Sequence, residues 1–189
     1  SRFGLEPGSD DLNEALAVLR QAGVQLRGLH CHISRCRGLE AWARRAQIML
    51  AAAGAYFPGG RPDYISLGSG MFADMEPALK AQFGGVPTYE QYAEATLRPF
   101  RDFYGDDGPM LFTEPGTTVV ARYLSFVSTV TSVKEVRGRC LANLDGSYEN
   151  LGEICTMKRL PLTRLPGGVG KHYDSIDLMG YTCLEQDLM

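Results

Sequence analysis

The amino-acid sequence predicts an α/β fold followed by an all-β part. Short apolar strands alternate with amphipathic helices up to residue 118, which is the pattern of parallel βαβ units. From residue 119 onward the chain is rich in Val, Thr, Tyr and Phe with stretches of alternating polarity, which is typical of antiparallel strands. Turns carrying histidine, glycine or glutamate follow three of the predicted strands. We therefore place an α/β part at 1–118 and an all-β part at 119–189.

The first helix is predicted from Ser9, a good N-cap residue that precedes two acidic residues. Apolar residues recur at helical spacing until Gly23 ends the pattern. Residues 24–27 follow as a short strand that leads into two histidines. A second helix is predicted over 39–53, with Gly54 closing it. The apolar face of this helix comprises Trp42, Ala46, Met49 and Leu50, and the opposite face comprises Arg44 and Arg45.

Further along the chain, Thr88 and Gln91 form a capping-box pattern for a helix that runs to about Phe100. Residues 71–85 are expected to form a lid-like loop with a short helix. The remaining predicted elements are strands at 64–67, 110–113 and 139–144, antiparallel strands within 119–136, a turn at 145–146 and a Pro/Gly-rich loop at 160–170.

Composition excludes several classes of protein. The 189 residues are 44% hydrophobic and 22% charged, with a net charge of −3, which is ordinary for a globular protein with a sizeable core. No basic patch indicates nucleic-acid binding, and the longest apolar stretch, 48–57, is too short to cross a membrane. The five cysteines match no zinc-site spacing. We expect reduced thiols, a cytoplasmic location and no metal site.

Candidate ligand-binding residues follow three of the predicted strands. His30 and His32 follow the first strand on one side of the pleat, and ligands collect at the carboxyl ends of parallel strands. Gly68, Ser69 and Gly70 follow the second strand, and their backbone N–H groups suit a phosphate. Glu114, held by the Pro-Gly turn after the third strand, can pair with a protonated ring nitrogen. Each feature alone is more often a plain turn or a rim salt bridge, but their order on successive strands indicates a pyridoxal phosphate pocket.

The sequence resembles the fold-type III pyridoxal-phosphate-dependent decarboxylases, which include the diaminopimelate, ornithine and arginine decarboxylases. The matching stretches occur in the family's order: residues 1–4, 28–33, 67–70, 114–116, and 180–183 with Asp187. The resemblance implies the carboxyl-terminal part of a TIM-like barrel followed by a β domain. A closed barrel needs about eight strands in about 250 residues, so we expect the chain to be part of a longer enzyme and inactive by itself.

The resemblance also implies roles by position. His32 matches the histidine that stacks on the cofactor ring, Glu114 the carboxylate that keeps the ring nitrogen protonated, and Cys183 the cysteine that acts across a homodimer interface. The cofactor-binding positions are His32, Ser34, Arg35, Gly68, Ser69, Gly70, Glu114 and Gly116. The family's cofactor-binding lysine falls upstream of the first residue.

The chain departs from the family at three places. Ser34 and Arg35 replace a Gly-Ser pair, so phosphate contacts are expected from one or both of them, and Thr117 replaces an arginine. After the cysteine, the substrate-reading positions are Leu184, Glu185 and Asp187. Leucine in place of an acidic residue favours substrates other than simple diamino acids, such as the larger polar conjugates of siderophore pathways.

Two alternatives stay open. An amino-acid racemase of the same barrel type normally pairs the ring nitrogen with arginine, and Glu114 argues against it. A non-catalytic regulatory homologue is favoured by Thr117 and Leu184. The leading interpretation is a decarboxylase similar to diaminopimelate decarboxylase that acts on a small amino-acid substrate, either a diamino acid or a siderophore-type conjugate.

Overall fold

The structure is a computed structural model that describes residues 3–152, 158–165 and 171–189. The chain divides into two compact units, one of Ser1–Ala73 with Val86–Val119 and one of Asp74–Gly85 with Val120–Met189. The division of the sequence into domains at 118 and 119 stays a prediction. No described helix combines the length and apolar character needed to cross a membrane.

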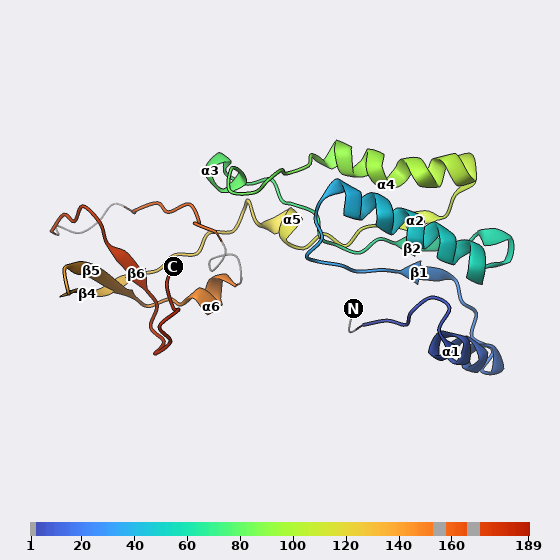
Figure 1. Cartoon of the computed structure of the whole chain (residues 1–189), viewed down its shortest axis with the longest axis horizontal. Helices are drawn as coiled ribbons and strands as arrows, with labels where there is room; N and C mark the ends of the chain where they lie inside the picture. The colour runs from blue at the N-terminus through green and yellow to red at the C-terminus, as the bar shows by residue number, and fades with distance from the viewer. Residues whose placement is uncertain (1–2, 153–157, 166–170) are drawn as a thin grey trace. The chain divides into compact units, whose positions relative to one another are not determined.

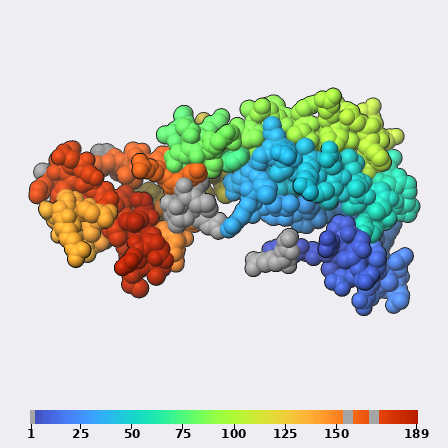
Figure 2. Space-filling view, viewed as in Figure 1, coloured from blue at the N-terminus to red at the C-terminus, as the bar shows by residue number. Residues whose placement is uncertain are grey.

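The first unit is a parallel sheet covered by helices (Figure 1). Its strands run in the order β1-β2-β3, with Leu29 beside Ile65 and Ile65 beside Leu111. Helices α2 and α4 pack against each other in a continuous layer (Figure 2). The elements of this unit are α1 (Asp10–Gln21), β1 (Gly28–His30), α2 (Leu39–Tyr56), η1 (Pro58–Gly60), β2 (Tyr64–Ser66), α4 (Tyr89–Tyr104), η2 (Gly105–Asp107) and β3 (Met110–Phe112), with α5 (Thr117–Val120) at its end.

The core of this unit lies between the sheet and the two helices. Trp42 of α2 and Tyr92 of α4 are fully buried, and their rings meet edge to face with centroids 5.5 Å apart, a favoured aromatic geometry. The buried cluster comprises Trp42, Ala46, Met49, Ala53, Ile65, Leu67, Tyr92 and Phe100. Both helices cover the same face of the sheet, so α2 lies behind the loops that follow the strands and can hold them in place.

The predicted helix starts are confirmed. The Ser9 side chain accepts a hydrogen bond from the Leu12 N–H. Thr88 and Gln91 form both halves of the capping box. These signals are local, since each joins groups only three residues apart.

Several predicted boundaries in the first unit are wrong. Helix α4 continues past Phe100 to Tyr104, and β2 and β3 each end one residue earlier than predicted. Residues 24–27 are not a strand, and β1 begins at Gly28 because the neighbouring strand β2 starts only at Tyr64. The Asp63 N–H still donates to the Arg27 carbonyl at 2.8 Å, but Pro62 before it has no N–H to continue the ladder. Helix α2 does not close at Gly54 but continues to Tyr56, since Gly54 does not have the positive φ with which a glycine commonly ends a helix.

The second unit is built on a small mixed sheet of order β4-β5-β6. Its elements are α3 (Pro77–Lys80), β4 (Val130–Val136), β5 (Arg139–Leu144), α6 (Tyr148–Leu151) and β6 (Asp177–Met179). A tight turn with Arg137 and Gly138 at positive φ joins β4 to β5. The predicted strand at 139–144 is confirmed, and α3 is the short helix expected within 71–85.

The prediction of strands throughout 119–136 is wrong for its first part. Val119 and Val120 belong to α5, and pairing begins only at Val130. The partner strand β5 has six residues, so it cannot pair with residues 119–129. Of the predicted loop at 160–170, residues 160–165 are neither helix nor strand, and 166–170 lie outside the described residues.

Candidate active site

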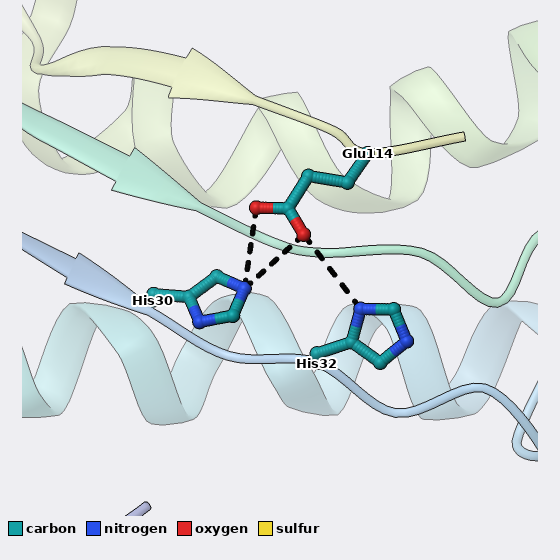
Figure 3. Close-up of side chains that lie close together, drawn as sticks. All are labelled: His30, His32 and Glu114. Carbon is teal, nitrogen blue, oxygen red and sulfur yellow. Dashed lines mark hydrogen bonds and ion pairs between the residues drawn. The ribbon is translucent and has the colours of Figure 1, made fainter. Parts of the chain in front are cut away.

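The carboxyl ends of β1 and β3 bring two histidines to one carboxylate (Figure 3). His30 is the last residue of β1, and its Nε2 lies 3.2 Å from the Glu114 carboxylate. His32 follows two residues later, with Nδ1 3.7 Å from Glu114 Oε2. Their rings are 6.4 Å apart and tilted by 47°. The two histidines therefore share one side of the strand, as the alternation of a strand requires.

Glu114 is held in place by β2 as well. Its backbone N–H donates to the Gly68 carbonyl at 2.8 Å, and its Oε1 accepts from the Ser66 hydroxyl at 2.7 Å. The Ser66 hydrogen bond holds the pKa of Glu114 below its usual value; partial burial opposes this, and the contacts with His30 and His32 add to it. Since an ionised carboxylate only accepts hydrogen bonds, His30 Nε2 must be the donor.

The arrangement offers an ionised carboxylate between two imidazoles. All three side chains are about half exposed, at 55% for His30, 45% for His32 and 47% for Glu114, so a ligand can reach them. One donor atom of each lies within 4.8 Å of the other two, and such a set also suits a divalent metal. The sequence pattern indicated no metal because Glu114 is distant in the chain, and the absence of a metal site stays a prediction.

Gly68 and Gly70 shape the turn after β2, in which the Gly68 N–H donates to the Ser66 hydroxyl at 3.2 Å. Both have positive φ, +65° and +99°, which disfavours any residue with a Cβ atom. A Cβ at Gly68 would lie 2.3 Å from the Cys31 carbonyl oxygen, and one at Gly70 would lie 2.2 Å from that of Ile33. The turn after β2 is thus packed backbone to backbone against the turn after β1. Both glycines are buried and Ser69 is half-buried between them.

Arg45 is a site residue that the sequence reasoning assigned to the wrong face. It is only 2% exposed, and its guanidinium donates to the carbonyls of Leu67, Ser69 and Ile33. Arg44, by contrast, is exposed as predicted. The signal was present in the spacing, because position 45 lies three residues after Trp42 and four before Met49, on the apolar face. This position was assigned to the exposed face because arginine is polar and is rarely buried.

The other predicted residues of the first unit lie around these turns. Ser34 and Arg35 are exposed, and the Ser34 carbonyl accepts from Arg37 Nε at 3.0 Å. Gly116 is exposed, and its carbonyl accepts from the Val119 N–H at 3.0 Å. Their contacts with a cofactor stay predictions.

Four predicted site residues belong to the second unit. Cys183, Leu184 and Glu185 are exposed. Asp187 is 1% exposed, and its carboxylate accepts from the Tyr148 N–H at 2.9 Å and from the N–H and hydroxyl of Thr182 at 3.0 and 2.5 Å. This carboxylate is committed to fixing the turn that carries Cys183. These three hydrogen bonds take up most of the acceptor capacity of the carboxylate, and its role in substrate binding stays a prediction.

Solved structures that share this fold include fold-type III pyridoxal-phosphate-dependent amino-acid decarboxylases. The arginine decarboxylase of Paramecium bursaria Chlorella virus matches with a TM-score of 0.72 at 23% identity, over 98% of this chain and 49% of that one. The diaminopimelate decarboxylase of M. jannaschii matches with a TM-score of 0.73 at 20% identity, over 100% of this chain and 43% of that one. The chain thus has the mixed α/β fold of part of these enzymes, in agreement with the resemblance seen in the sequence.

A curated relative is similar at the level of sequence. The diaminopimelate decarboxylase of Actinosynnema pretiosum subsp. auranticum is 30% identical over 158 residues, which cover 79% of this chain and 34% of that protein. No protein-family profile matches the chain. The chain spans about one third of this relative and just under half of the two solved structures.

Proposed function

We propose that the chain forms part of the active site of a pyridoxal-phosphate-dependent amino-acid decarboxylase. The observation that carries this proposal is the ionised Glu114 beside His30 and His32, with a glycine turn on the strand between them. The similarity to decarboxylases supports the class of reaction. The proposed architecture of the whole protein is a closed barrel followed by a β domain.

The donor set fits this cofactor. Glu114 provides a fixed negative charge that holds a proton on a ring nitrogen, and the Ser66 hydrogen bond keeps the carboxylate ionised for this task. His32 offers a flat ring at the same edge. In the glycine turn the Gly68 N–H donates to the Ser66 hydroxyl, so the backbone N–H groups proposed for a phosphate are those of Ser69 and Gly70. When bound, pyridoxal phosphate supplies an electron-withdrawing ring that stabilises the electron pair left on carbon after CO2 departs.

Cys183 has a proposed role in the protonation step that follows the loss of CO2. Its thiol is exposed, and we propose that it donates a proton to the carbon that has lost CO2. General acid catalysis by a positioned group typically contributes about 10²–10⁴-fold. We propose that the cysteine acts across a two-fold homodimer interface, since two-fold dimers are the commonest closed assemblies.

The proposed substrate is an amino acid with a larger polar side chain, as in siderophore-type conjugates. Leu184 offers no charge for a distal ammonium group, and Asp187 is engaged within its own unit. Glu185 is exposed and is the remaining acidic candidate near Cys183. A cytoplasmic location is part of the same proposal.

The test uses the protein at its natural length. Binding of pyridoxal phosphate is followed by its visible absorption band, which borohydride should abolish. CO2 release is then measured with diaminopimelate, ornithine, lysine, arginine and their acylated derivatives, with and without a chelator, which should have no effect. Failure to bind the cofactor would remove the proposal. Cofactor binding without CO2 release would favour the non-catalytic regulatory homologue, which Thr117 also favours. Racemisation of the substrate would favour the amino-acid racemase.

The shared-site proposal has its own test. Subunits with Cys183→Ala are mixed with subunits that lack the cofactor-binding lysine, and both parents should be inactive. Hybrid dimers with shared sites should recover a sizeable fraction of activity. No recovery after confirmed subunit exchange would show that Cys183 serves its own subunit or no site.

A further inference from the structure

Arg45 is buried behind the two turns that carry the candidate site. Its Nη1 donates to the carbonyls of Leu67 at 2.6 Å and Ser69 at 2.8 Å, and its Nη2 to that of Ile33 at 3.0 Å. The Trp42 ring lies against the guanidinium at 4.3 Å, and Trp42 Nε1 donates to the Gly70 carbonyl at 3.1 Å. Two side chains of α2 therefore hold four carbonyls of the two turns.

The charge of Arg45 has no carboxylate partner in the described part of the chain. Its Nε is buried and makes no hydrogen bond with any described group. Burial lowers the pKa of Arg45, and the nearby thiols of Cys31 and Cys36 oppose this shift. A buried cation compensated by carbonyl dipoles and an aromatic ring, without a carboxylate, is costly, and an anion bound nearby would reduce that cost.

The carbonyl bonds to Arg45 also orient amide groups. In a planar trans peptide the N–H points opposite to the C=O. Because the carbonyls of Ile33 and Ser69 point at Arg45, the N–H groups of Ser34 and Gly70 point away from it. Neither N–H donates to another described group. The two residues are neighbours, since a Cβ at Gly70 would lie 3.3 Å from the Ser34 Cα atom.

We propose that Arg45 is the positioning residue of a phosphate site made by the backbone amides of Ser34 and Gly70. Arg45 aims these amides and places a positive charge behind them. This inference rests on the proposed function, because it assigns the site to the phosphate group of pyridoxal phosphate. The inference also explains how a phosphate site could exist with Thr117 in the place of an arginine, since Arg45 on α2 supplies the positive charge. Lysine cannot replace Arg45, because a single ammonium group does not match three carbonyls in the plane of a guanidinium.

The test compares two ligands that differ only in the phosphate. Dissociation constants for pyridoxal phosphate and pyridoxal are measured on the natural-length protein as wild type, Arg45→Met, Arg45→Lys and Arg44→Met. The last variant is the matched control, since Arg44 is the exposed neighbour on the same helix. Arg45→Met should weaken pyridoxal phosphate binding by about 10–100-fold, the effect of losing charge-assisted hydrogen bonds, and pyridoxal binding by less than about threefold. Arg44→Met should change neither.

Several results would overturn the inference. They are equal losses for the two ligands, an unchanged affinity of folded Arg45→Met for pyridoxal phosphate, or an equal effect of Arg44→Met. If Arg45→Met does not fold, Arg45→Lys decides: a loss of about tenfold for pyridoxal phosphate alone supports the inference, and no loss refutes it.

Inorganic phosphate separates this inference from the proposed function. Its binding is followed by phosphorus NMR on wild type and the same variants. Phosphate binding that depends on Arg45, without any binding of pyridoxal phosphate, would keep the anion site and remove the proposed function. Wild type that binds neither ligand would overturn both.

Discussion

Replacing Gly68 with alanine tests the backbone contact on which the site is built. The substitution forces a Cβ onto φ of +65° and within 2.3 Å of the Cys31 carbonyl oxygen. The left-handed conformation costs a residue with a Cβ about 1–2 kcal/mol. Overpacking against backbone adds about 1–3 kcal/mol. We therefore expect Gly68→Ala to lower the free energy of unfolding of the first unit by about 2–5 kcal/mol.

Two other glycines provide matched controls. Gly59 has the same φ of +65° but nothing within 4 Å of its Cβ position, so Gly59→Ala should cost only the conformational part, about 1–2 kcal/mol. Gly54 lies within α2 in open space, so Gly54→Ala should stabilise the unit by about 0.5–1 kcal/mol.

The assay is hydrogen exchange of peptides from α2, read by mass spectrometry on the natural-length protein. In the equilibrium regime it reports the free energy of opening of this unit, with about 1.4 kcal/mol for each tenfold change in rate. If Gly68→Ala costs no more free energy of unfolding than Gly59→Ala, the turns after β1 and β2 do not pack backbone to backbone, and the site is not built on this contact.

Three further predictions concern carboxylates. Glu114→Gln should leave the cofactor bound but slow decarboxylation by at least about 10²-fold, whereas Glu94→Gln on the surface of α4 should have no effect; near-normal turnover would remove Glu114 from its role. Ser66→Ala should raise the pKa of Glu114 toward its usual value, since the serine hydrogen bond is the main cause of its lowering; a carbon-13 titration of the carboxylate measures this, and an unchanged pKa contradicts it. Burial alone would raise the pKa of Asp187, but its hydrogen bonds lower this pKa overall. The ionised carboxylate therefore stabilises the second unit at pH values above its unfolded-state pKa, and this stability is lost as the pH falls through the folded-state pKa. Asp187→Asn should destabilise that unit at neutral pH and remove this acid-range loss, as measured by exchange of β5 peptides; a pH dependence equal to that of wild type would refute this.

What the sequence predicted correctly is mostly local. The Ser9 cap and the capping box of Thr88 and Gln91 depend on neighbours three residues away. The meeting of His30 and Glu114, 84 residues apart, was foreseeable because both lie at the carboxyl ends of strands of one parallel sheet.

The errors arise where the outcome depends on distant groups. The start of β1 is set by where β2 begins, and the limit of β4 by the length of β5. The burial of Arg45 depends on carbonyls from two turns, 12 to 24 residues away in sequence. The hydrogen bonds of Asp187 were likewise not predictable, since one of them comes from an amide 39 residues away.

The turn after β2 links the two charged groups of the site. Its Leu67 and Ser69 carbonyls accept from Arg45 on one side, while its Gly68 carbonyl accepts from the Glu114 N–H on the other. Ser66, at the start of this turn, donates to the Glu114 carboxylate. A displacement of the carbonyls should therefore reach Glu114.

Arg45→Lys tests this coupling without changing the net charge. If the lysine no longer holds both carbonyls, the turn shifts and the Ser66 hydroxyl loses its alignment with Glu114. The pKa of Glu114 should then rise, although no charge near it has been removed. The same carbon-13 titration measures the effect, and Arg44→Lys is the control that should leave the titration unchanged. If the pKa of Glu114 stays at the wild-type value in folded Arg45→Lys, the two sides of the turn are independent, and Arg45 acts on the phosphate side alone.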